Sequence, residues 1–394
     1  MSPLMRLALP VLAAASAAYA ASCSISATTT IQSGGDASAL ASCTTFSGSI
    51  AIATGAAGPL ALNGIKRIAG TLSANNNSAL TTLSSDSLES IDQFELTDVT
   101  ALSEINFPKL STVKTLKWIS VSVLANLVSA ITSADGIDIE NTKLQSLSGI
   151  NLETVGDIKI VNNIFITEIE MQVTNITGVL IFEGNNADLT IKLADLKAAN
   201  NMTFQSCSSI EVPALASLND SLVLLKNTFD SFIAPNLTKI GNSLVINDNN
   251  KLTNISFPLL TGVSRALQIA NNTELGKIDG LPKLAKIGAD LDFHGNFSEV
   301  SLPSLTDVTG TFNIQSTGDI QNTCDTKFKP MSNQGGTSRI QGKYTCIGSV
   351  ANPGGEGTTP TPTGSGAKKT GAASSLNVQA GALSFAGLAA AFFL

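Results

Sequence analysis

The sequence is poor in charge, in aromatic side chains and in histidine, and each shortage argues against a class of function. Charged residues make up 13% and aromatic residues 5% of the 394 residues, and the formal net charge is −7. Proteins that bind nucleic acids usually present a basic face, and this chain carries a net negative charge, so we expect no nucleic-acid partner. With His294 as the single histidine and four of the five cysteines expected in disulfide bonds, a histidine and cysteine metal cluster or a Ser-His-Asp triad is nearly excluded. We therefore predict no metal site, no cofactor and no catalytic residues.

The N-terminus has the pattern of a secretory signal peptide. Arg6 precedes an apolar run at 7–18 that is too short to span a bilayer. Small residues, Ala18 and Ala20, occupy the two positions that a signal peptidase reads. We expect residues 1–20 to be removed.

The C-terminus has the pattern of a GPI-attachment signal. Residues 347–371 are rich in Gly, Pro and Thr, a composition that forms a stalk rather than a packed core. Small residues from Gly371, a short polar spacer and an uncharged tail ending at Leu394 then follow. A transmembrane helix would need about 20 apolar residues and usually a basic flank. The pattern predicts attachment at Gly371 and a propeptide at 372–394.

Cysteines and glycosylation sequons fit a secreted protein. We expect Cys23 to pair with Cys43 and Cys324 with Cys346, at the two ends of the folded part, which leaves Cys207 over. Each bridge would close a loop of about 20 residues, worth roughly 3 kcal/mol in the chain-entropy account. Asn-x-Ser/Thr sequons predict N-glycosylation at Asn76, Asn175, Asn201, Asn219, Asn236, Asn254 and Asn271.

A repeat of about 22 residues dominates the remainder and predicts the fold. Its prolines are spaced by 21 to 24 residues, at Pro213, Pro235, Pro258, Pro282 and Pro303. Each unit contains a Leu-x-Ile step, in which both aliphatic side chains share one face of a strand. One unit cannot bury that face alone, but stacked units share a continuous core. The repeat therefore predicts that residues 21–346 form an all-β solenoid of about thirteen turns.

One column of the repeat, three residues after the second aliphatic of the step, is often Asn. Leucine-rich repeats accept Asn or Cys at such a place because the inward side chain bonds the backbone of the turn. Cys207 falls in this column, so we interpret it as a ladder residue rather than a redox or catalytic thiol. Asn296 is both a ladder position and a sequon, and we expect the ladder role. The column reads Gly55, Asn77, Val99, Val121, Thr142, Asn163, Asn185, Cys207, Asn227, Asn249, Asn272, Asn296 and Thr317.

The repeated Phe/Leu-Pro-x-Leu-x-x-Val/Ile unit, the paired end cysteines, the sequons and the anchor signal together resemble a known family. They are similar to the fungal GPI-anchored cell-wall organisation proteins of the sporulation-specific, receptor L-domain-like family, over essentially the whole chain. The resemblance implies a leucine-rich-repeat-like, right-handed β-helix with disulfide caps, held to the outer leaflet of the plasma membrane or to the wall. In such proteins a basic pair before the anchor, here Lys368-Lys369, is associated with retention at the plasma membrane.

The outward column of the repeating strand changes character along the chain. Glu95, Lys117, Asp138 and Lys159 alternate in sign and predict a ladder of exposed ion pairs. An exposed apolar stripe is expected next, as a candidate binding surface, unless a stalk, a glycan or a loop packs on it. Its residues are Ile181, Val223, Leu225 and Val245.

We therefore expect a non-catalytic cell-surface glycoprotein needed for wall organisation and integrity, whose partners are wall glucan or wall proteins. A wall-glucan-remodelling enzyme is the first alternative, and it would need two carboxylates about 5 to 10 Å apart. Close pairs occur at Asp138 with Glu140, Glu168 with Glu170, and Asp290 with Asp292, each on one outward face or turn. A receptor-like module that binds a soluble ligand is the second alternative.

Overall fold

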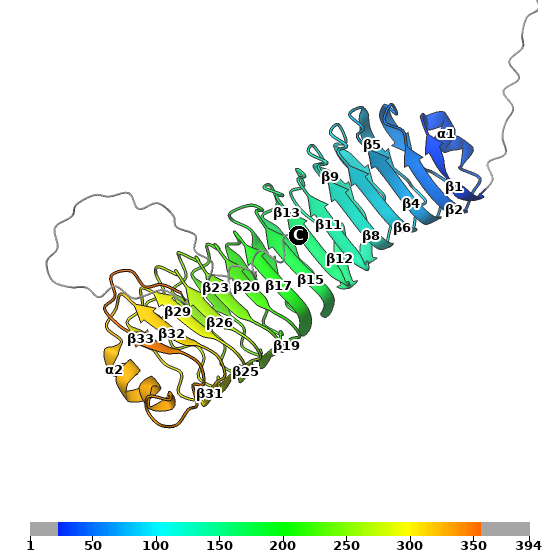
Figure 1. Cartoon of the computed structure of the whole chain (residues 1–394). Coiled ribbons are helices and arrows are strands. Elements are labelled where there is room, and N and C mark those ends of the chain that lie inside the picture. Colours follow the sequence, from blue (N-terminus) through cyan, green and yellow to red (C-terminus); the bar gives the residue numbers. More distant parts are fainter. Residues whose placement is uncertain (1–22, 356–394) are drawn as a thin grey trace, which may run out of the picture.

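A computed structural model describes residues 23–355. The expected signal peptide, the anchor residue Gly371, the Lys368-Lys369 pair and the propeptide lie outside the described residues. The chain winds into an elongated coil whose strands run across its long axis (Figure 1). The prediction of an all-β solenoid is confirmed.

A long strand from each turn builds the main sheet, in which all neighbours are parallel and the register is continuous apart from a few local irregularities. The thirteen strands from β2 to β32 match the predicted turns, and the two end segments add β1 and β33. The column runs β1 (Ser24–Ile31), β2 (Thr45–Ile52), β4 (Arg67–Asn75), β6 (Ser90–Thr97), β8 (Thr112–Ile119), β11 (Gly136–Glu140), β13 (Asp157–Val161), β15 (Asn175–Glu183), β17 (Ala198–Gln205), β20 (Leu222–Leu225), β23 (Leu244–Asn247), β26 (Leu267–Ala270), β29 (Leu291–Gly295), β32 (Phe312–Ser316) and β33 (Tyr344–Ile347).

Shorter strands complete each turn. Some extend the main sheet just before its strands: β10 (Ile131–Ser133), β12 (Ile150–Thr154), β19 (Ser217–Leu218), β22 (Lys239–Ile240), β25 (Gly262–Val263), β28 (Lys286–Ile287) and β31 (Asp307–Val308). A second face of the coil carries four small sheets. They are β3 (Gly58–Ala61), β5 (Leu80–Ser84), β7 (Glu104–Asn106) and β9 (Asn126–Val128); β14 (Glu168–Glu170), β16 (Thr190–Lys192) and β18 (Ser209–Glu211); β21 (Ser231–Ile233) and β24 (Asn254–Ser256); β27 (Lys277–Ile278) and β30 (Glu299–Val300).

The core is a set of aliphatic and aromatic columns that run the length of the coil. Leu244, Leu267 and Leu291 lie directly over one another in register and are fully buried. Trp118 is also fully buried, with its ring edge-on to Phe94 at 5.3 Å. Because each turn buries one face against its neighbours, the stack as a whole holds the fold together.

The predicted ladder forms at many of the turns after the main strands, whereas Val99 and Val121 fill the same place with buried apolar side chains. Asn249 is typical: its Oδ1 accepts from the backbone N of Asn227 at 2.9 Å, and its Nδ2 donates to the backbone O of Leu224 at 3.0 Å. The residue before many of these inward side chains has a left-handed backbone, as at Asn76 and Asn271 with φ of 50° and 55°. The ladder thus supplies hydrogen-bond partners to buried backbone groups of neighbouring turns.

The ladder differs from the prediction near its C-terminal end. Asn296 is exposed, and Phe297 takes the inward place, with its backbone N donating to Ser316 Oγ at 3.0 Å. Ser316, rather than Thr317, is the next buried member. The turn from Asn272 to Phe297 spans 25 positions, so it is longer than its neighbours and moves the expected register by one residue.

Disulfide-bonded caps close both ends. Cys23 and Cys43 are bridged at the N-terminal end, where helix α1 (Gly34–Ala39) has a capping box between Ser33 and Asp36. Cys324 and Cys346 are bridged at the C-terminal end, which carries α2 (Gln321–Thr323), the π-helix η1 (Cys324–Phe328) and the 3-10 helix η2 (Lys329–Met331). Such caps keep the apolar ends of a stacked coil from exposure.

Candidate functional site

The outer face of the main sheet has the predicted register but not the predicted ion pairs. Lys117 lies opposite Asp138, and Asp138 lies opposite Lys159. In the described part of the chain, however, Lys159 pairs with Glu140 instead of Asp138. The reason is geometric, because a long side chain on one strand can reach the diagonal neighbour on the next strand as well as the direct one.

Three acidic side chains surround Lys159 of β13: Asp138 and Glu140 on β11, and Glu183 on β15. Burial raises the pKa of Asp138 to about 6, an effect that Lys159 opposes and Glu140 reinforces. One carboxylate oxygen of Asp138, Oδ1, is buried without a hydrogen-bond partner. Burial also raises the pKa of Glu183, while the bond to Glu140 raises the pKa of Lys159. The cluster therefore holds a carboxyl group that titrates near pH 6.

The other two carboxylate pairs have structural partners. Glu168 is exposed on β14 and forms an ion pair with Lys192 at 2.5 Å. Asp290 Oδ1 accepts from the backbone N of Thr311 at 2.7 Å. These contacts orient the side chains as parts of the coil.

The structure contradicts the expectation that the apolar stripe is exposed. Ile181 and Leu225 are half-buried, but Val223 and Val245 at its centre are only 6% and 9% exposed. Val223 lies in register between Thr203 and Val245, and side chains in such a column stand about 4.8 Å apart and shield one another. The stripe does not offer the exposed area that a binding patch requires.

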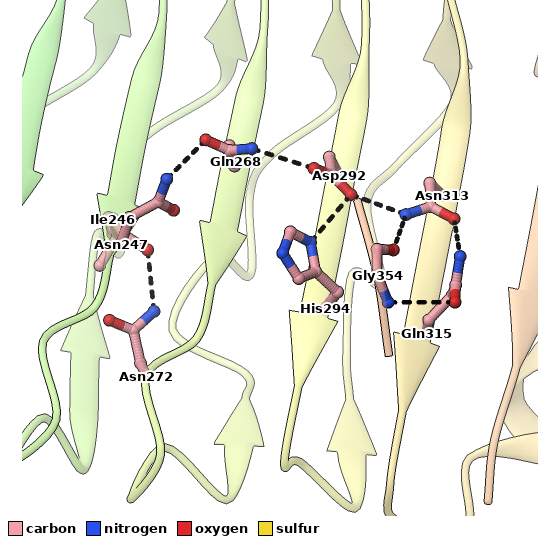
Figure 2. A network of polar contacts seen from close by, with 9 residues as sticks. All are labelled: Ile246, Asn247, Gln268, Asn272, Asp292, His294, Asn313, Gln315 and Gly354. Atoms are coloured by element: carbon pink, nitrogen blue, oxygen red, sulfur yellow. Dashed lines mark hydrogen bonds and ion pairs between the residues drawn. The ribbon is translucent and has the colours of Figure 1, made fainter. Parts of the chain in front are cut away.

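A buried polar network continues the outer column toward the C-terminal end (Figure 2). Asn247 Nδ2 donates to Gln268 Oε1 at 2.7 Å, and Gln268 Nε2 donates to Asp292 Oδ2 at 3.0 Å. Asp292 is 1% exposed, and its Oδ1 also contacts Asn313 Nδ2 at 2.7 Å and His294 Nδ1 at 3.2 Å. The carboxylate has a partner on each oxygen, which is what a buried charge requires.

The segment after the last strand docks on this network. Gly354 O accepts from Asn313 Nδ2 at 3.0 Å, and Gly354 N donates to Gln315 Oε1 at 3.2 Å (Figure 2). The folded part therefore continues past the expected boundary at 346, to Gly355 at least. The local sequence carries no signal for this contact, because the partners lie 41 and 39 positions upstream.

The sequons differ in exposure. Asn201 lies on β17 and is 4% exposed, so the expectation of a glycan there is corrected: a buried amide has no room for one. Asn296, which we had assigned to the ladder, is exposed instead. The remaining sequon residues are exposed, at Asn76, Asn175, Asn219, Asn236, Asn254 and Asn271.

Residues 23–355 contain no group of three or more His, Cys, Asp or Glu side chains arranged to hold a metal ion. Cys207 is fully buried, and burial raises the pKa of its thiol to about 12. Within the same range, no helix is both long and apolar enough to cross a membrane.

Fold and surface together define a disulfide-capped parallel β-solenoid. The sequence profile of Ecm33, described as a GPI-anchored cell wall organization protein, matches residues 4–41. The chain is 38% identical to Protein ecm33 of Aspergillus fumigatus over 354 residues, covering 89% of this chain and 87% of that protein. It is 38% identical to a cell surface GPI-anchored protein of Arthroderma benhamiae over 339 residues, or 85% of each chain. It is also 33% identical to Sporulation-specific protein 2 of Saccharomyces cerevisiae over 306 residues, or 77% of this chain and 60% of that one.

The chain belongs to the Ecm33 family of fungal GPI-anchored cell-wall organisation proteins, which confirms the resemblance seen in the sequence. Its relatives are named as cell-surface or cell-wall proteins, and membership places this chain at the cell surface. No solved structure matches the chain significantly.

Proposed function

We propose that the chain is a non-catalytic, GPI-anchored glycoprotein needed for the organisation and integrity of the fungal cell wall. In this proposal residues 1–20 are a signal peptide, the solenoid follows from residue 21, a stalk leads to Gly371, and 372–394 are replaced by the anchor. The six exposed residues among the seven predicted glycosylation sites carry N-glycans. The anchor holds the protein to the outer leaflet, where wall glucan or wall proteins are its partners.

Family membership across nearly nine tenths of the chain carries this proposal. The regular stacking of the turns in the structure supports the proposal. Thirteen similar turns give a long scaffold whose buried polar groups, at the ladder and at Asp292, have structural partners. Such quasi-linear repeat proteins present extended surfaces.

Removal of the gene from its fungus tests the proposal. Cells lacking the protein should become more sensitive to wall-binding dyes, and the full chain should restore resistance. A version ending at residue 370 should be secreted and should fail to restore it, and phosphatidylinositol-specific phospholipase should release the full chain from cells. Unchanged dye sensitivity in the deletion strain would reject the proposed role.

One observation favours the wall-glucan-remodelling enzyme as a second candidate. Asp138, with its pKa raised to about 6, neighbours Glu140, and a carboxyl group with a raised pKa near a second carboxylate is one requirement of glycosidases. Incubation of the purified chain with labelled β-glucan oligomers separates the two functions. Turnover that disappears in the Asp138→Asn variant would establish the enzyme and defeat the non-catalytic proposal.

A further inference from the structure

The second face of the coil opens between β9 and β14. Residues 145–151 pass between these strands without forming a strand ladder with β14, which is therefore the edge of its own sheet. In the described chain a single hydrogen bond, from Gln172 N to Asn151 Oδ1 at 3.3 Å, joins this segment to 167–172 of the next turn. Within each of the four sheets of this face, neighbouring turns are linked by strand pairing, as in β3, β5, β7 and β9.

The separation of the two turns produces a groove of about 480 Å³. Its floor is apolar and buried, formed by Leu147, Ile150 and Ile169 at 4%, 1% and 1% exposure. Its walls are polar, and nearly all of their side chains are exposed; besides serine and threonine hydroxyls they contain Gln145, Asn151, Glu168, Glu170 and Gln172. The volume lies within the range of small-ligand sites, which combine an apolar lining with a few polar groups that fix orientation.

The charges of the groove select against anions. Among residues 23–355, no Lys or Arg lines it, whereas phosphate and carboxylate ligands are usually held by such cations. Lys192 of β16 pairs with Glu168, so one of the two wall carboxylates is already neutralised. The walls otherwise consist of amides and hydroxyls, which both donate and accept hydrogen bonds.

We propose that this groove binds a short stretch of a neutral oligosaccharide. A sugar ring has an apolar C–H face, which suits the aliphatic floor, and a rim of hydroxyls, which suits amides and carboxylates on the walls. On β14 the two glutamates face outward on either side of the buried Ile169, so both carboxylates stand above the floor as acceptors. This inference rests on the proposed wall function and names the class of wall component that this site would take.

A peptide strand added to the edge of β14 is the competing occupant. β14 is only three residues long and carries two glutamates, and short, charged edge strands are the means by which proteins avoid strand addition. The edge therefore disfavours a peptide, whereas the polar walls remain available to hydroxyl groups.

Titration of the purified full chain with neutral hexasaccharides tests the proposal. The probes are β-1,3-linked glucose, β-1,4-linked N-acetylglucosamine and α-1,6-linked mannose, followed by calorimetry and saturation-transfer NMR. We expect one of them to bind with a Kd in the millimolar range or tighter. The double variant Gln145→Ala, Gln172→Ala should weaken it at least tenfold, and Glu170→Gln should weaken it as well.

Controls make the result decisive. Gln334→Ala removes an exposed amide remote in sequence and should leave the affinity unchanged, and unfolding curves should show the groove variants to be folded. The inference is overturned if no hexasaccharide binds, or if the double variant binds as tightly as the original chain. It is also overturned if the original chain binds a lysine-rich decapeptide instead and the double variant loses that binding. None of these outcomes touches the wall function itself, which is scored by the phenotype of the deletion strain.

Discussion

At the scale of single residues, Cys207 shows how position in a repeat decides chemistry. Its backbone N donates to Asn227 Oδ1 at 2.9 Å, as the other ladder members do, and its thiol donates to the backbone O of Gln205 at 3.7 Å. A thiol whose pKa is raised to about 12 is protonated at any physiological pH and is therefore a poor nucleophile.

We expect Cys207→Asn to fold with a stability within about 1 kcal/mol of the original chain, because neighbouring turns already accept Asn in this column. The native thiol should also resist iodoacetamide at pH 8 and react only in denaturant. Urea unfolding and mass spectrometry check both points. Rapid alkylation of the folded chain would contradict the ladder role and restore the reactive-thiol alternative.

Asp138 should make stability depend on pH. Its folded pKa of about 6 lies above the ordinary value of 3.8, so the folded state binds the proton more tightly. The resulting stabilisation is complete below about pH 4 and is lost as the pH rises through about 6. A shift of about two units corresponds to roughly 3 kcal/mol, which partial exposure reduces to about 1 kcal/mol.

Asp138→Asn removes the titrating group, so the variant should be more stable than the original chain at pH 7.5 by about 1 kcal/mol and nearly equal to it at pH 4.5. The measurement is urea unfolding at the two pH values. Asp135→Asn, an exposed position three residues upstream, is the matched control. Parallel pH profiles for Asp138→Asn and the original chain would refute the assignment.

At the scale of elements, the sequence predicted the strand register well and the departures from it poorly. The Leu-x-Ile step identifies inward and outward positions along the main sheet, because period two leaves no alternative once a core exists. Asn296 was placed in the ladder wrongly because one turn is longer than its neighbours. Val223 was wrongly expected to be exposed because the burial of an outward column depends on what packs around it. The groove beside β14 was missed, since the stretch 145–149 still places Leu147 inward and reads like any other turn.

Among the elements of the coil, truncation of a ladder side chain should lower the free energy of unfolding most for the number of atoms removed. Asn249→Ala leaves the backbone N of Asn227 and the backbone O of Leu224 without their side-chain partners. Each buried group left unpaired costs about 1–3 kcal/mol, so we expect a loss of about 2–4 kcal/mol in the free energy of unfolding. Urea denaturation followed by circular dichroism measures it.

The neighbouring Asn250 supplies the comparison, because it is exposed and a surface substitution there should change stability by less than about 0.5 kcal/mol. Equal losses for Asn249→Ala and Asn250→Ala would mean that the ladder bonds contribute nothing beyond general effects of the substitution.

At the scale of the whole molecule, the chain leaves the solenoid from its side. Gly355 lies against Asp292 and His294 of β29, two strands back from the C-terminal strand β33 in the main sheet. With attachment at Gly371, the anchor residue lies 16 positions beyond Gly355, a distance of at most about 55 Å when extended. The rod would then be tethered through the outer face of its sheet rather than through its capped end.

Hydrogen exchange of the full chain tests the docked segment on which this tethering depends. The Gly354 amide, which donates to Gln315 Oε1, should be protected in the native protein. The double variant Asn313→Ala, Gln315→Ala removes both side-chain bonds to Gly354, and loss of about 1 kcal/mol per bond predicts exchange at least tenfold faster across 350–355. Gln341→Ala, whose side chain bonds Asp307 on the exposed surface, should leave this segment protected. Exchange of Gly354 at the rate of an unstructured peptide in the original chain would show that the segment is undocked, and the tether would then leave from the capped end.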